Sequence, residues 1–186
     1  VGLSGNAFAN MTTSDDGHFI FSALDEGFDY TITPLMEANP LNGVSTFDLV
    51  LMSKHILGLQ NLDTPYKVLA ADVNNDGRVT AQDAIALRRL ILNIDTKFSN
   101  NSSWRFVDAS YQFSVPSNPW ADEFPEVINV NDLQGALQNA DFVAIKVGDM
   151  SLDAKANALT AETRSKQGVF ALSTENVSMT AGNEYR

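Results

Sequence analysis

Residues 72–83 read Asp-Val-Asn-Asn-Asp-Gly-Arg-Val-Thr-Ala-Gln-Asp, which is the pattern of a calcium-binding loop. Calcium is a hard cation that takes about six to eight oxygen ligands, and such a loop offers side-chain oxygens at alternate positions. Gly77 stands at the sixth position, where the backbone turns sharply with a positive φ. The predicted ligands are the side chains of Asp72, Asn74, Asp76, Thr80 and Asp83 and the main-chain carbonyl of Arg78.

An ordinary surface turn is the alternative interpretation of this loop, since Asn, Asp and Gly also dominate turns. Two features favour calcium: every ligand position is filled, and a helical pattern follows at once over residues 81–92. The loop departs from a standard EF-hand at its last position, where Asp83 replaces the usual Glu. The apolar side of the expected helix consists of Ile85, Leu87, Leu90, Ile91 and Leu92.

A second copy of this loop-and-helix pattern lies 35 residues earlier in the chain. Residues 44–48 align with residues 79–83, and the pair at 56–57 is identical to the pair at 91–92. Extending the alignment backwards places Leu41 at the fifth loop position, so this loop lacks one side-chain oxygen. The predicted ligands of the first loop are Asn39, the carbonyl of Gly43, Ser45 and Asp48, with Glu37 at the first position. The sequence thus predicts Ca²⁺ in the second loop and allows a weaker Ca²⁺ site in the first, with a loop closed by hydrogen bonds alone as the alternative.

This duplicated loop and helix resembles the dockerin module, a small calcium-dependent domain that binds cohesin domains in large secreted bacterial proteins. The resemblance covers residues 35–97 and is most specific in the second repeat. It implies a partner-binding face at loop positions 10 and 11 and about one turn into each helix. Those positions are Thr46, Phe47, Ser53 and Lys54 in the first repeat and Ala81, Gln82, Arg88 and Arg89 in the second. Because the two sets differ, the sequence does not support two interchangeable binding modes.

The flanking segments have strand patterns. Residues 12–24 and 28–34 alternate polar and apolar side chains around turns, and they resemble the end of a carboxypeptidase regulatory-like or Cna-B-like β-sandwich. The opening strands of such a sandwich are missing here, so its sheet is expected to have open edges. The tail at 169–186 resembles the opening strands of a cohesin-like β-sandwich.

Between these flanks, further strands are expected at 104–107, 111–115, 127–131 and 141–149. Asp149 is interpreted as a turn residue after Gly148, with ion coordination as the alternative. The predicted class is α+β, with β-sandwich pieces flanking a dockerin-like two-helix module of the EF-hand type. The predicted boundaries are 1–34 for the sandwich part, 35–97 for the module, 98–158 for a β-rich segment and 159–186 for a strand-like tail.

Composition narrows the possible functions. The 186 residues carry a net charge of −11, which argues against binding to nucleic acid or to an anionic membrane. The chain has no cysteine, so disulfides and thiolate metal sites are excluded, and it has no apolar run long enough to span a membrane. With two histidines and none of the common catalytic motifs, the sequence predicts no enzymatic activity.

The sequence therefore predicts an extracellular or cell-surface calcium-binding protein. The first hypothesis is a structural subunit of a surface filament or adhesive fibre, in which neighbouring copies of the chain join head to tail by strand exchange and form a homo-polymer. Calcium would then stiffen the dockerin-like joint. The alternative is a dockerin that anchors a secreted protein to a cohesin-like partner.

Overall fold

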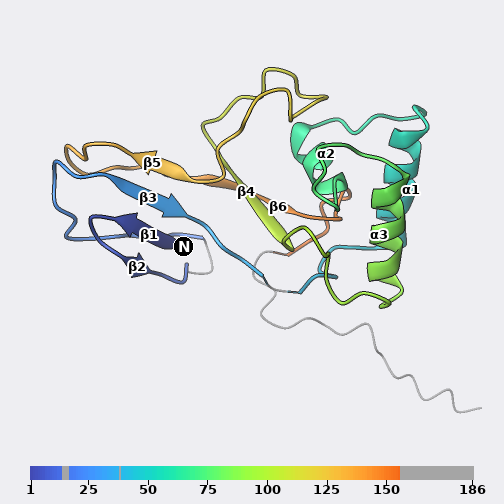
Figure 1. Cartoon of the computed structure of the whole chain (residues 1–186), viewed down its shortest axis with the longest axis horizontal. Helices are drawn as coiled ribbons and strands as arrows, with labels where there is room; N and C mark the ends of the chain where they lie inside the picture. Colours follow the sequence, from blue (N-terminus) through green and yellow to red (C-terminus); the bar gives the residue numbers. More distant parts are fainter. Residues whose placement is uncertain (14–16, 38, 156–186) are drawn as a thin grey trace, which may run out of the picture.

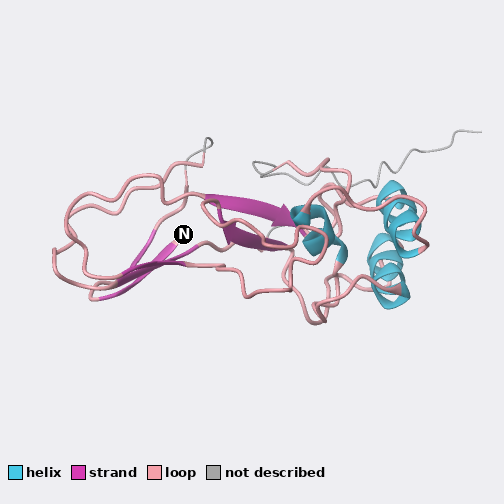
Figure 2. Ribbon diagram, turned by 90° about the horizontal axis from the view of Figure 1, so that it is seen from above, coloured by secondary structure: helices cyan, strands magenta, loops and turns pink. Residues whose placement is uncertain are grey.

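The computed structural model describes residues 1–13, 17–37 and 39–155. Within these ranges the chain forms six strands and three helices, which confirms the predicted α+β class. A sheet lies at one end of the elongated molecule and the helices lie at the other (Figure 1). Figure 2 shows a second, two-stranded sheet between them. None of the helices found in the described part of the chain has the length and apolar character required to cross a membrane.

The sheet at the first end has four antiparallel strands in the order β2-β1-β3-β5. These strands are β1 (Gly2–Gly5), β2 (Ala9–Asn10), β3 (Tyr30–Thr33) and β5 (Ile128–Val130). Leu3, Tyr30 and Ile32 are buried on one face. The strand expected at 28–34 is therefore present as β3 and that at 127–131 as β5, whereas the described residues 17–24 form no strand. The expected sandwich is not confirmed.

The second sheet has two strands, β4 (Trp104–Asp108) and β6 (Phe142–Lys146), which pair antiparallel in agreement with the strands expected there. It packs on α2 (Pro65–Ala71) through a small core that includes Leu69, Val107 and Ile145. The predicted strand at 111–115 is absent; instead, Phe113 makes ring contacts with Tyr66, Tyr111 and Phe124 beside this core. The segment 98–158 thus contributes strands to both sheets.

The helical end is built from α1 (Thr46–Ile56) and α3 (Ala81–Ile91), which pack against each other. Each begins with a capping box in which the Ser or Thr N-cap and an Asp three residues later exchange hydrogen bonds. The shared core contains Met52, Leu87 and Leu90, together with Val147 and Met150 from the segment after β6.

The predicted apolar side of α3 was too wide. Leu87 and Leu90 are buried, but Ile85 and Leu92 are 58% and 61% exposed. The partners of α3 in this core, which include α1 and the segment after β6, contact one stripe of its side chains, so Ile85 outside that stripe and Leu92 at the C-cap face solvent.

Gly148 gives a direct test of this packing. Its φ is +88°, and a Cβ at this position would lie 2.9 Å from Leu87 Cδ1 and 3.2 Å from Val44 Cγ2. Gly148→Ala should therefore combine left-handed strain with overpacking and cost about 2–4 kcal/mol in the free energy of unfolding. Gly58→Ala is the control, since φ is +66° there with nothing near the new Cβ; it should cost about 1–2 kcal/mol. Urea unfolding of both variants measures the difference, and equal losses would contradict the packing.

Candidate metal centre

The loop 72–83 is held between two helices. Asp72 is the C-cap of α2, and Asp83 lies in the first turn of α3; both side chains are fully buried. The Asp72 carboxylate accepts hydrogen bonds from the amides of Asp76 at 3.0 Å and Gly77 at 2.9 Å. The backbone therefore curls around the carboxylate at loop position 1, as the sequence pattern requires.

The carboxylate at position 12 closes the same loop. Asp83 Oδ1 accepts a hydrogen bond from the amide of Asn74 at 3.2 Å, and its Oδ2 accepts from the amide and the hydroxyl of Thr80 at 2.8 and 3.2 Å. The Asn74 side chain donates to Asp76 Oδ2 at 2.9 Å. The predicted side-chain ligands are thus linked in one network, and a carboxylate oxygen that accepts from an amide still has a lone pair for a cation.

The electrostatics of the loop favour a bound cation. Burial raises the pKa of Asp72, and the neighbouring charges of Asp83 and Asp76 raise it further, against the two backbone hydrogen bonds that lower it. A cation at the centre would reverse the repulsion between these carboxylates. Across the described residues, no three His, Cys, Asp or Glu side chains form a ready metal cluster. Calcium, however, also takes amide, hydroxyl and carbonyl oxygens, which this loop supplies at Asn74, Thr80 and Arg78, so the donor set fits.

Residues from the β-rich segment brace the loop, and the sequence analysis did not anticipate them. Asn101 donates its side-chain amide to the carbonyl of Asp72 at 2.9 Å. Arg105 donates to the side chain of Asn75 at 3.0 Å, while Trp120 lies against Gly77. No local sequence signal marks these contacts, because they join positions far apart in the chain.

The first repeat keeps only the second half of its predicted loop in the same arrangement. Asp48 is fully buried, and its Oδ2 accepts from the amide and hydroxyl of Ser45 at 2.8 and 2.9 Å. Its Oδ1 accepts from the amides of Met150 and Ser151, both at 2.9 Å. Asp48 therefore binds a segment about 100 residues downstream.

The predicted first half of that loop has other roles. Glu37 is exposed, and Asn39, with φ +42°, accepts the amide of Asn42 through its carbonyl. The ammonium of Lys146 donates to the carbonyls of Pro40 and Val147 at 2.8 and 2.9 Å. Burial lowers the pKa of Lys146 to about 8, although the charges of Asp149 and Asp48 oppose that shift.

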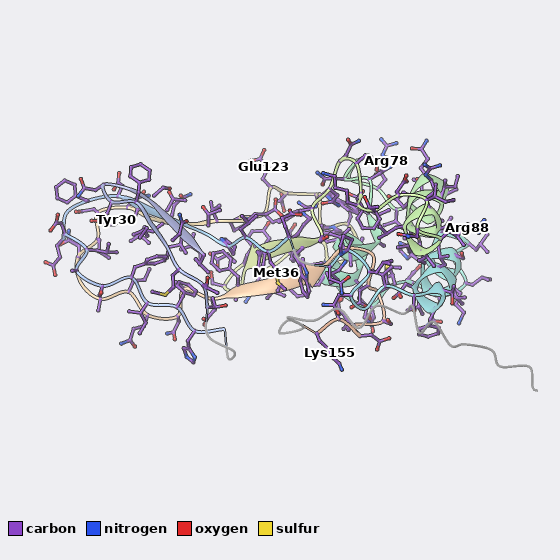
Figure 3. The ribbon with its side chains drawn as sticks, turned by 90° about the horizontal axis from the view of Figure 1, so that it is seen from below. Tyr30, Met36, Arg78, Arg88, Glu123 and Lys155 are labelled. Carbon is purple, nitrogen blue, oxygen red and sulfur yellow. The ribbon has the colours of Figure 1, made fainter. Side chains whose placement is uncertain are left out.

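The two loops lie on different sides of the helical end. In Figure 3, Arg78 marks the loop 72–83, and Lys155 marks the segment against the first repeat, on the opposite border of the molecule. Arg88 lies on α3 at the end farthest from Tyr30 of the sheet.

Comparison with known families agrees with this geometry. Residues 42–92 match the family model of the dockerin type I domain. No curated protein and no solved structure matches the chain. The matched range includes α1, α2, α3 and the whole loop 72–83. Residues 42–92 thus resemble a dockerin type I domain, both in the sequence match and in the arrangement of the loop 72–83 between α2 and α3.

Proposed function

We propose that the chain is part of an extracellular protein in which the dockerin-like module binds calcium and then docks onto a cohesin-like domain. The observation that carries this proposal is the loop 72–83. Its first and last residues, Asp72 and Asp83, are both fully buried, and the charge of Asp83 acts on the carboxylate of Asp72. Without a cation, two negatively charged carboxylates lie close together with little water around them. Binding of calcium to the folded loop would therefore add to the free energy of unfolding of the module.

The outer surfaces of α1 and α3 would form the docking face. Phe47 and Val50 on α1 are 56% and 47% exposed, and they lie one turn apart. Ile85 on α3 is also exposed and precedes Arg88 and Arg89 by about one turn. The eight contact positions implied by the dockerin resemblance are exposed or half-buried. Apolar anchors beside arginines are typical of protein interfaces.

Removal of calcium should destabilise the module. With free calcium about 100-fold above its dissociation constant, binding adds about 2.7 kcal/mol, which corresponds to a fall of roughly 5–10 °C in melting temperature when EGTA is added. Asp76→Asn should reduce this difference because it removes a charged ligand at an exposed loop position. Terbium reports the same site, because Trp120 lies against Gly77 and can sensitise its luminescence.

Glu123→Gln is the matched control, since it removes one exposed carboxylate outside the loop and should leave the calcium effect unchanged. A melting temperature that does not respond to EGTA, together with no tryptophan-sensitised terbium signal, would refute calcium binding by the loop.

Charge introduced into the docking face should weaken partner binding and leave calcium binding intact. Phe47→Asp and Ile85→Asp each replace an exposed apolar side chain and should weaken binding to a cohesin domain by about 30-fold or more, as expected for an interface hot spot. Ile20→Asp is the control, because Ile20 is 72% exposed but lies outside the module. Calorimetric titration against a panel of cohesin domains measures the affinities. Equal losses for all three variants, or no calcium-dependent binding to any cohesin, would argue against this face.

A surface filament is the second candidate, and the four-stranded sheet is the observation that favours it. β2 and β5 are its edge strands, and no further strand of the described ranges pairs with them. An unpaired edge can accept an extended segment from another chain. The segment predicted to be exchanged, 169–186, lies outside the described residues.

Removal of residues 167–186 tests the filament. If chains exchange strands, the shortened protein should remain monomeric under conditions in which the complete chain forms fibres visible by electron microscopy. Phe170→Asp with Leu172→Asp should have the same effect, whereas Ser173→Asp should not, because side chains alternate along a strand and Ser173 would point away from the neighbouring core. A complete chain that stays monomeric at all concentrations would exclude polymerisation by this route.

A further inference from the structure

The segment that binds Asp48 has the spacing of a calcium loop. It reads Asp149-Met150-Ser151-Leu152-Asp153, with oxygen-bearing side chains at alternate positions, as at positions 1, 3 and 5 of the loop 72–83. Asp149 is 2% exposed and therefore buried like Asp72, its counterpart. The segment follows β6 directly and is remote in sequence from the first repeat.

The carboxylate of Asp149 orders its segment in the same way as Asp72 orders its own loop. Asp149 Oδ1 accepts the amide of Asp153 at 3.2 Å, and its Oδ2 accepts the amide of Ala154 at 2.8 Å. These are the amides four and five residues ahead, which are also the two that Asp72 binds.

The closing carboxylates correspond as well. Asp48 accepts the amide of Ser151, two residues after Asp149, and Asp83 accepts the amide of Asn74, two residues after Asp72. Each of the two also accepts the amide and hydroxyl of the N-cap residue of its own helix.

The backbone and the core follow the same correspondence. Leu152 has φ +64° where Asn75 has φ +57°, although a leucine is strained in that region. Met150 and Val73, which follow the two buried aspartates, are both fully buried in the core between the helices. Leucine does not favour this φ, so the surrounding tertiary structure must hold the segment in the loop conformation.

The close approach of Gly43 is an independent indication that the two segments form one loop. A Cβ on Gly43 would lie 2.7 Å from Asp149 Oδ2 and 2.5 Å from the amide nitrogen of Ala154. Asn42 exchanges two hydrogen bonds with the backbone of Lys155, at 2.8 and 3.1 Å. The start of the dockerin match at residue 42 coincides with this junction, so Glu37 and Asn39 lie outside the match.

The charges indicate what occupies the centre. The carboxylates of Asp48 and Asp149 act on the buried ammonium of Lys146, whose hydrogen bonds go to main-chain carbonyls. Asp153 is exposed and adds a third carboxylate, which the Ser151 hydroxyl links to Asp149 by donating to both. Two negative charges are left over, and one calcium ion would neutralise both. The available donors are carboxylates, the hydroxyl of Ser151 and a main-chain carbonyl, all of them hard oxygens.

We propose that residues 149–154 and 43–48 together form a discontinuous calcium site, in which the first segment supplies loop positions 1–6 and the second supplies positions 7–12. Asp149, Ser151 and Asp153 take positions 1, 3 and 5, the carbonyl of Gly43 takes position 7, and Asp48 closes the site. The oxygen missing at Leu41 is thereby supplied by Asp153. This inference rests on the proposed calcium binding of the module, and it makes the ion a link between α1 and the chain that leaves β6.

The number of calcium ions bound per chain tests the proposal. Native mass spectrometry of the complete chain should find two ions. Asp149→Asn with Asp153→Asn should leave one, because each change removes a negative charge, while an asparagine at position 149 keeps one of the two oxygens that accept the amides of Asp153 and Ala154. Tryptophan-sensitised terbium emission from the loop 72–83 should persist in this variant and shows that the module is still folded. Glu37→Gln with Asn39→Ala is the matched control and should retain both ions.

If the double variant is unstable, the single variant Asp153→Asn tests the proposal, because Asp153 is exposed and its substitution should not unfold the protein. It should weaken one of the two sites by more than the ~10–100-fold that loss of a second-shell partner costs. The proposal is overturned if these variants keep two equally tight ions, or if the Glu37/Asn39 control loses one. A single ion in the unmodified chain that is lost with Asp76→Asn overturns the discontinuous site and leaves the proposed function intact. No bound calcium at all overturns both.

Discussion

Asp48 and Asp83 are fully buried carboxylates in the first turns of α1 and α3, and the helical end depends on how their charges are compensated. Burial of an unpaired carboxylate costs several kcal/mol, so both oxygens of each aspartate must accept hydrogen bonds. The amides of its own helix N-terminus provide part of this compensation. The rest comes from a second segment, at Asn74 for Asp83 and at Met150 and Ser151 for Asp48.

The two carboxylates differ in how far away that second segment lies. For Asp83 it is the preceding loop, nine residues away, whereas for Asp48 it is 102 residues downstream. The segment after β6 must therefore return to α1, and it carries Val147 and Met150 into the core between the helices. Gly148 lies between these residues without a side chain, because Leu87 and Val44 fill the space. The dockerin-like range 42–92 is consequently completed by residues outside it.

This closure connects the module to the β-rich part of the chain. β6 runs directly into the returning segment and pairs with β4, whose Arg105 also reaches the loop 72–83. This two-stranded sheet packs on α2, whose C-cap residue is Asp72. The loop 72–83 and the segment after β6 therefore both connect the helices to the two-stranded sheet, while Phe47 on α1 and Ile85 on α3 stay exposed.

Local interactions explain what the sequence determined by itself. The loop 72–83, the capping boxes at Ser45 and Thr80 and the helices that follow all depend on residues a few positions apart, so their patterns are visible in the chain. Only the tertiary structure decided the rest. Backward extension of the repeat from Asp48 leads to Asn39 and Leu41, but the amides of Met150 and Ser151 bind Asp48 instead, and Met150 is buried in the core between the helices. The exposure of Ile85 and Leu92 has the same origin, because the number of packed neighbours, and not helical periodicity, sets how much of a helix is buried.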